Sequence, residues 1–184
     1  GIVHRLDRET SGVIVLGRTE AALAELMRQF KAREVTKTYQ VLVEGEPRFD
    51  SDWIEAPIGR DPRHPERMAL LDLEHGGRAA TTFYEVQERL GSLSFVHAQP
   101  KTGRTHQIRV HLHSIGCPVV GDRVYRGQRG RAVALPAGVS LPHRQMLHAH
   151  RLELTHPTSG APLRFEAAPP ADFAALLEQL RAVR

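Results

Sequence analysis

Short apolar runs in hairpin-like succession are the feature that most constrains the fold of this 184-residue chain. The alternation in the first of them places Tyr39, Val41 and Val43 on one strand face. A further short run, residues 13–16, is typical of a fully buried strand. The five main runs predicted to form strands are residues 36–43, 78–86, 93–98, 146–154 and 163–167. Many strands and few helices favour the α+β class, with a central mixed, largely antiparallel sheet flanked by helices and loops.

Three segments carry apolar residues at helical spacing, and two of them have start or stop signals. Thr19 is expected to cap the first helix, Thr105 the second, and Gly116 to end the second near residue 115. The positions predicted to face the core are Leu23, Leu26, Met27, Phe30, Ile108, Leu112, Ile115, Phe173, Leu176, Leu177 and Leu180. Residues 46–78 are rich in Pro, Gly, Asp and Arg, which predicts an irregular connection with a short strand near 53–58. Residues 126–142 are expected to form a mobile loop.

Charge and cysteine content narrow the class of protein. The chain carries a net charge of +4 at pH 7 with a pI near 9.7, which favours an acidic partner such as nucleic acid. Of its 25 basic residues only three are lysine, a ratio that we attribute mainly to genome composition. Cys117 is the single cysteine, so no intramolecular disulfide can form and a cytoplasmic location is expected. No apolar run reaches membrane-spanning length, and we expect no membrane partner.

Residues 4–12, HRLDRETSG, place one acid in a constrained frame. Asp7 has an arginine on each side, Arg5 and Arg8, and opposite charge nearby keeps a carboxylate ionised. An ionised, positioned aspartate acts as a nucleophile or a base. The Thr-Ser-Gly that follows supplies hydroxyl groups and a flexible backbone for a turn. This arrangement predicts a catalytic loop around Asp7.

Four segments in this order resemble the RluA-type family of RNA pseudouridine synthases. They are HRLD with TSG at 4–12, KTY at 37–39, TGRTHQIRVHL at 102–112 followed by Gly121-Asp122, and LHA at 147–149 before His156-Pro157. The resemblance implies the family's sheet fold and the isomerisation of uridine to pseudouridine in structured RNA, without a cofactor. Residues 1–184 are then expected to form a single catalytic domain that lacks N-terminal strands of the family. The PIGR run at 57–60 with RMA at 67–69 favours large-subunit ribosomal RNA as the substrate, with transfer RNA as the alternative.

The resemblance also implies roles for three catalytic residues. Asp7 matches the family's catalytic aspartate, and residue types leave open whether it attacks C1′, attacks C6 or removes a ribose proton. Arg109 matches the basic residue that pairs with that aspartate, a role that Arg104 could also take from the preceding loop. Tyr39 is expected to stack on the flipped base, a contact worth about 1–3 kcal/mol in related settings.

Further residues are predicted to bind RNA, and the set is Arg5, Arg104, His106, Gln107, Arg126, Arg129 and Arg131. For Arg5, filling the gap left by a flipped nucleotide and pairing with Asp7 are equally supported. For His106 and Gln107, service to the loop fold and contact with RNA both stand.

Three alternatives were weighed against the enzyme, which we expect to act as a monomer. A metal site is not predicted, because His106, His111 and His113 are spaced by five and two residues and fall on different helix faces. Ser11 lacks the Gly-x-Ser-x-Gly context of a hydrolase nucleophile. A non-catalytic RNA-binding or ribosome-assembly module is the rival from another class, and the presence of both Asp7 and Arg109 argues against it.

Overall fold

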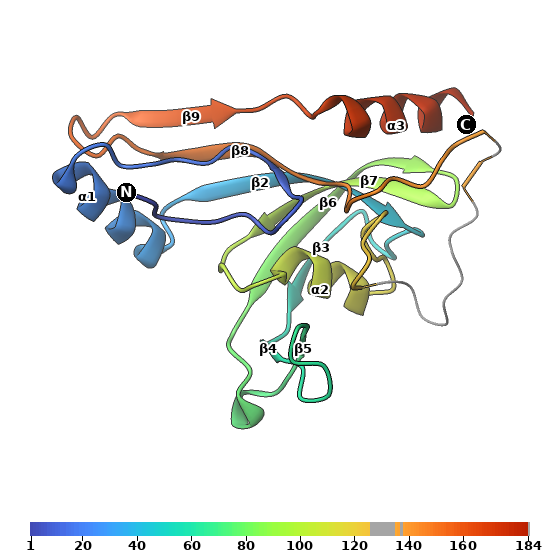
Figure 1. The fold of residues 1–184 in the computed structure, drawn as a ribbon, viewed down its shortest axis with the longest axis horizontal. Helices are drawn as coiled ribbons and strands as arrows, with labels where there is room; N and C mark the ends of the chain where they lie inside the picture. The colour runs from blue at the N-terminus through green and yellow to red at the C-terminus, as the bar shows by residue number, and fades with distance from the viewer. Residues whose placement is uncertain (126–134, 137, 184) are drawn as a thin grey trace.

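A computed structural model describes residues 1–125, 135–136 and 138–183 of the chain (Figure 1). In this part a seven-stranded sheet has the order β1-β8-β2-β7-β6-β3, with β9 paired to β8. The strands are β1 (Ser11–Gly12), β2 (Thr36–Glu44), β3 (Ser51–Glu55), β6 (Thr81–Leu90), β7 (Leu93–Pro100), β8 (Leu147–Thr155) and β9 (Pro162–Glu166). Only the short pair β1–β8 is parallel. The predicted α+β class and the mixed, largely antiparallel sheet are therefore confirmed.

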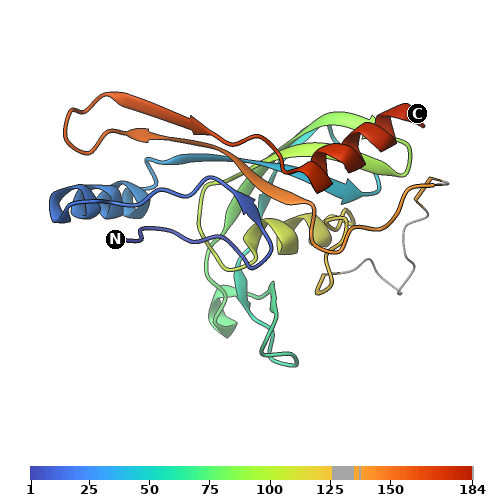
Figure 2. The ribbon, with the colours of Figure 1, turned by 45° about the horizontal axis from the view of Figure 1, so that its top comes forward.

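Two helices cover opposite faces of this sheet, α2 (Gln107–Ser114) and α3 (Ala171–Ala182) (Figure 2). The alternation along β2 explains the two layers. Val41 and Val43 pack in the cluster that includes Ile108 of α2, whereas Leu42 packs in the cluster that holds Phe173 of α3. All four apolar positions predicted for the C-terminal helix are buried.

Helix α1 (Glu20–Ala32) lies at one end of the sheet beside the N-terminal segment (Figure 1). Thr19 is the predicted N-cap, and its hydroxyl accepts the Ala22 N–H at 3.2 Å. The prediction for Met27 was wrong, since it is 55% exposed. Gln29 takes the buried place instead, because its amide exchanges hydrogen bonds of 2.8 and 3.0 Å with the backbone of Thr155.

Four sequence expectations need correction. Residues 13–16 do not form a fully buried strand, because they run along the sheet edge with Ile14 and Leu16 exposed. Thr105 does not cap α2: His106 occupies that position in the left-handed region, without a side-chain cap. Ile115, expected in the core, is 38% exposed. Residues 46–78 are more regular than predicted, since they contain β3, β4 (Ile58–Arg60), β5 (Met68–Leu70) and the 3-10 turn η1 (Leu73–His75).

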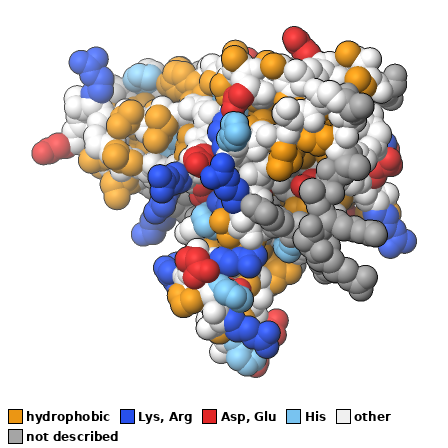
Figure 3. Space-filling model, turned by 45° about the vertical axis from the view of Figure 1, so that its right-hand side comes forward, with side chains coloured by type: hydrophobic (Ala, Val, Ile, Leu, Met, Phe, Trp, Pro, Cys, Tyr) orange, Lys and Arg blue, Asp and Glu red, His pale blue; other side chains and the backbone are white. Residues whose placement is uncertain are grey.

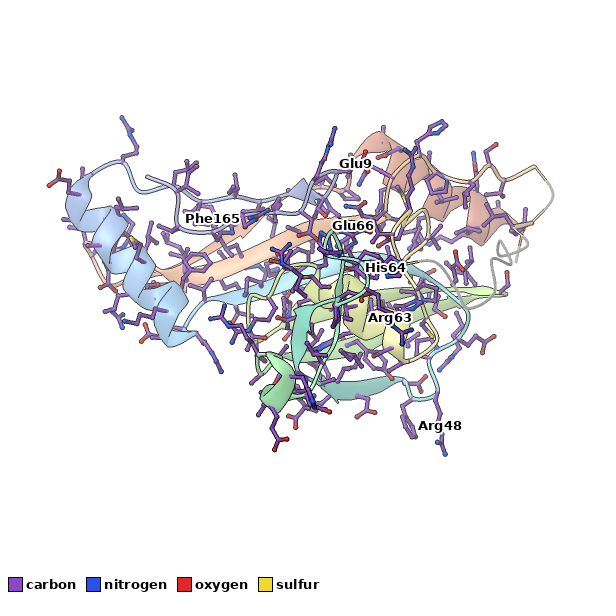
Figure 4. All side chains as sticks on the ribbon, turned by 60° about the horizontal axis from the view of Figure 1, so that its bottom comes forward. Glu9, Arg48, Arg63, His64, Glu66 and Phe165 are labelled. Carbon is purple, nitrogen blue, oxygen red and sulfur yellow. The ribbon has the colours of Figure 1, made fainter. Side chains whose placement is uncertain are left out.

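The β4–β5 hairpin extends from the sheet, and its connecting loop carries Arg63, His64 and Glu66 (Figure 4). Of the loop predicted at 126–142, residues 126–134 and 137 lie outside the described part. Within the described part, no helix is long and apolar enough to cross a membrane.

Candidate active site

A pocket of about 240 Å³ opens where residues 3–10 meet the first half of β2, the end of β7 and the loop before α2. The residues of interest that line it are Arg5, Asp7, Lys37, Tyr39, Arg104 and His106. Most of the residues that the sequence singled out thus reach one cavity from distant parts of the chain. Figure 3 shows that lysine and arginine side chains gather near the middle of one face, with acidic and histidine side chains among them.

The turn after Asp7 is held from both sides. The Asp7 carbonyl accepts the Thr10 N–H at 3.0 Å, which closes the turn. Buried Gln145 donates to the Arg8 carbonyl at 2.6 Å and to the Thr10 hydroxyl at 3.2 Å. The backbone at Gly12 has φ +125°, and a Cβ there would lie 2.2 Å from the Ala149 carbonyl oxygen of β8. Glycine is therefore required for this segment to lie so close to the sheet.

A buried histidine, His148, holds Ser11 of the same segment. His148 Nε2 lies 3.0 Å from the Ala167 carbonyl oxygen, which can only accept, so this nitrogen carries the proton. Nδ1 then accepts the Ser11 hydroxyl at 2.9 Å. Burial lowers the pKa of His148, in keeping with a neutral ring. Ser11 therefore ties β1 to β8.

Asp7 receives an ion pair from Arg109, as the resemblance implies. Arg109 Nη1 lies 3.3 Å from Asp7 Oδ2, and the Asp7 side chain is 18% exposed. In the described part of the chain neither Arg5 nor Arg8 makes an ion pair with Asp7, so charge support comes from α2 and not from sequence neighbours. Exposed Arg5 stays at the pocket wall.

Sequence reasoning missed the residue that holds Arg109. The Asp122 side chain is fully buried and accepts Arg109 Nε at 2.6 Å and Nη2 at 3.0 Å. Asp122 Oδ1 also accepts the backbone N–H groups of Val124 and Tyr125 at 2.8 and 3.0 Å. The signal was present, because Gly121-Asp122 follows the third motif and a buried arginine needs a buried counter-ion.

Arg109 contacts its two carboxylate partners, Asp122 and Asp7, unequally. Burial alone would raise the pKa of Asp122, but the hydrogen bonds and charge of Arg109 outweigh it and hold that pKa below its usual range. Asp122 therefore remains ionised and takes the two short contacts, while Asp7 has the single longer one. Arg109 can thus orient Asp7 without fully neutralising it.

Tyr125 completes the support of Arg109 and links it to His106. The Arg109 guanidinium carbon lies 5.0 Å from the Tyr125 ring centroid. The Tyr125 hydroxyl accepts the Met68 N–H at 2.8 Å and lies 2.8 Å from His106 Nδ1. Burial, followed by the charge of Arg109, lowers the pKa of His106. The neutral ring can therefore accept a hydrogen bond from the Tyr125 hydroxyl at Nδ1.

Tyr39 reaches the pocket from β2, opposite Ala149 of β8 and Ala98 of β7. Burial, with a further contribution from the Asp7 charge, raises the pKa of Tyr39 to about 12. The phenol therefore stays protonated near neutral pH. Its ring is available to a flat ligand, whereas its hydroxyl is a poor base.

Gln107 holds the loop before α2, and its side-chain amide has few hydrogen-bonding positions left for a ligand. Its Oε1 accepts the Thr102 hydroxyl at 2.7 Å and the Arg104 N–H at 2.9 Å. Its Nε2 donates to the Thr81 carbonyl and to the Thr82 hydroxyl, both at 2.9 Å. Of the two roles expected for Gln107, these contacts support the loop fold. RNA binding by Gln107, which also lines the pocket, stays a prediction.

Arg104 projects from this loop into the pocket wall, and its Nε donates to the Ala79 carbonyl at 3.0 Å. The alternative in which it replaces Arg109 beside Asp7 is not supported, because the ion pair falls on Arg109. Arg126, Arg129 and Arg131 lie outside the described residues. No group of three or more metal-ligating side chains occurs among the described residues.

Comparisons with known proteins identify the family of this α+β domain. Residues 1–114 match the family model described as RNA pseudouridylate synthase, and the chain belongs to this family. It is 46% identical over 98% of its length to the ribosomal large subunit pseudouridine synthase D of Nitrosomonas europaea, and covers 51% of that protein. A protein of Chloroflexus aurantiacus, described as an uncharacterized RNA pseudouridine synthase, is 47% identical over 98% of this chain, which covers 54% of that protein. The chain thus spans about half the length of these curated relatives.

Solved structures show the same fold. The human RNA pseudouridylate synthase domain-containing protein 1 superposes with a TM-score of 0.75 at 30% identity, over 98% of this chain and 80% of that one. The human RNA pseudouridylate synthase domain-containing protein 4 superposes with a TM-score of 0.80 at 28% identity, over 98% of this chain and 75% of that one.

Proposed function

We propose that this chain isomerises uridine to pseudouridine in structured RNA, and that its substrate is large-subunit ribosomal RNA. One observation carries the proposal: a partly exposed carboxylate, Asp7, is oriented in a pocket by a buried arginine and faces the same cavity as Tyr39. The target uridine would be flipped out of its stack to reach this cavity.

The reaction conserves atoms and electrons, so side chains alone can serve it. The bond between N1 and C1′ breaks, the base turns, and a bond forms between C5 and C1′. The C5 proton leaves and N1 gains a proton. Attack at C1′, attack at C6 and removal of a ribose proton all require an ionised carboxylate beside the nucleotide, and Asp7 supplies it. No cofactor is part of the proposal.

Tyr39 and Arg109 have distinct roles in this proposal. Arg109 is shared between Asp122 and Asp7, so it aims the catalytic carboxylate and leaves charge on it. Tyr39 stacks on the base, since a phenol with a pKa of about 12 is poorly suited to remove the C5 proton at neutral pH. Arg5, at the pocket wall, fills the place of the flipped nucleotide.

Ribosomal RNA is the finer part of the proposal. Support comes from relatives of Nitrosomonas europaea and Pseudomonas aeruginosa that are named ribosomal large subunit pseudouridine synthase D, at 46% and 42% identity. The test is to map pseudouridines in ribosomal and transfer RNA by carbodiimide labelling and primer extension, in the source organism and in a deletion strain. Sites lost from large-subunit RNA support the proposal, and sites lost from transfer RNA alone identify the other substrate. A deletion that removes no site favours a non-catalytic RNA-binding module.

A further inference from the structure

A second cavity, of about 290 Å³, shares a wall with the candidate active site. Phe30, Lys37, Thr102, Gly103 and Arg104 line both cavities. The new cavity is formed where the end of α1 meets the start of β2 and the end of β7. A ligand group in it would therefore lie directly beside whatever occupies the active-site pocket.

The lining of this second cavity is basic. The five cations, called the basic pocket below, are Lys31, Arg33, Lys37, Lys101 and Arg104. No aspartate or glutamate lines it among the described residues. The nearby carboxylate of Glu34 is already occupied, because both its oxygens accept hydrogen bonds from Arg28 at 2.7 and 2.8 Å.

The cations of the basic pocket are also left without anionic partners. Lys37 Nζ donates to the Thr102 carbonyl at 3.3 Å, a neutral acceptor. Lys101 Nζ lies 5.7 Å from the Trp53 ring centroid. No ion pair to any of the five occurs in the described part of the chain. By contrast Arg28, one turn away on α1, has two carboxylate partners.

Burial and the neighbouring positive charges both disfavour the charged form of Lys37. Burial lowers the pKa of Lys37 to about 8, and the charges of Lys101 and Arg33 add to the effect. Burial together with the charges of Arg78 and Arg33 likewise lowers the pKa of Arg104. An anion placed among these groups would offset the repulsion and raise the pKa of Lys37.

We propose that the basic pocket binds a backbone phosphate of the RNA, next to the nucleotide that enters the active site. Three observations carry this: the wall shared with the active-site pocket, the absence of carboxylates among its described lining residues, and the convergence of cations from α1, β2 and the loop after β7. The ligand class is a phosphodiester, which lysine and arginine bind by charge and hydrogen bonds. The inference rests on the proposed function for the identity of the polymer.

The test removes two exposed charges that the catalytic site does not use. Arg33→Gln and Lys101→Gln remove the charge and keep a polar side chain on a methylene stem, and neither residue makes an ion pair among the described residues, so the fold should be unaffected. The matched control is Arg48→Gln, since exposed Arg48 lies beyond the opposite end of β2 (Figure 4). The nine residues of β2 separate the two places by roughly 30 Å at about 3.3 Å per residue.

The first readout is binding of a fluorescent oligouridylate as a function of salt. Loss of this one phosphate contact should reduce the slope of log K against log salt by about 0.7, so the double variant should bind with a shallower slope and on the order of tenfold more weakly. Arg48→Gln should keep the parental slope. An unchanged slope in the double variant would overturn the proposal.

The second readout is the apparent pKa of Lys37, from the pH dependence of its acylation followed by mass spectrometry. Oligouridylate should raise this pKa in the parent and not in the double variant, and an analogue with a neutral methylphosphonate backbone should have no effect. If inorganic phosphate raises it and oligouridylate does not, the cavity takes a free anion and the RNA assignment is wrong. Neither readout requires turnover, so an inactive enzyme would contradict the proposed function and leave this inference standing.

Discussion

Asp122→Asn is expected to be among the most destabilising single-atom exchanges in the site. Asp122 Oδ1 accepts three hydrogen bonds that an asparagine oxygen could keep. Its Oδ2 accepts only the Arg109 Nε–H at 2.6 Å, and the replacement would point an NH₂ group at that donor. One charge-assisted hydrogen bond, worth about 1.5–3 kcal/mol, is lost and the buried guanidinium keeps an incomplete partner. Breaking a buried pair in this way costs about 3–5 kcal/mol.

Arg144 and Asp172 provide a matched control for burial. Their two contacts, 2.7 and 2.8 Å, have the same bidentate form, but the Asp172 side chain is 50% exposed. Water and salt screen such a pair, so Asp172→Asn should cost about 1 kcal/mol or less. Asp7→Asn should also cost little, because Asp7 gives up only one 3.3 Å contact.

The assay is urea unfolding of the three variants at pH 7, and then at pH 4 and below. Because the folded-state pKa of Asp122 lies below its unfolded value, its contribution is present above the unfolded pKa, near 3.9, and is lost as the pH falls through the folded pKa. The gap between parent and Asp122→Asn should therefore narrow in acid. Equal unfolding free energies for Asp122→Asn and Asp172→Asn at pH 7 would refute the reasoning.

Substitutions at three other positions test the site and its frame. Tyr39→Phe should retain most activity and Tyr39→Leu should lose roughly tenfold or more, because stacking needs the ring; equal losses in kcat would show that the hydroxyl is required. Gly12→Ala should strongly destabilise the segment, because Gly12 has φ +125° and a Cβ there would lie 2.2 Å from the Ala149 oxygen. A thermal unfolding midpoint within about 2 °C of the parent would exclude the clash. Thr19→Ala should cost about 1 kcal/mol in urea unfolding through loss of the cap on α1, and Thr19→Ser should recover it; no loss would mean that the cap contributes nothing.

Much of the fold could be predicted from alternation and spacing alone. The strands β2, β6, β7, β8 and β9 and the C-terminal helix lie close to their predicted ranges, and all of them except the mostly exposed β9 have one face in the core. Errors fell where tertiary contacts override local pattern. Residues 13–16 are apolar but run along a sheet edge, and Gln29 replaces Met27 in the core because an end of β8 offers backbone partners.

The candidate site divides in the same way. Motifs identified Asp7, Tyr39 and Arg109, and the fold brings all three together. The partners of Arg109 could not be read from pattern, because the Asp122 and Tyr125 contacts depend on how the chain returns to α2. The basic pocket was also hidden, since its cations come from three separate elements.

The most direct test of the central claim is release of the C5 hydrogen. RNA from the deletion strain, labelled with tritium at uridine C5, is incubated with the full-length protein purified from its source organism and with its Asp7→Asn variant. The account predicts tritium release by the parent and none by Asp7→Asn, with unfolding free energy and RNA affinity nearly unchanged. Substantial release by a stably folded Asp7→Asn protein would contradict the role of Asp7 in the reaction.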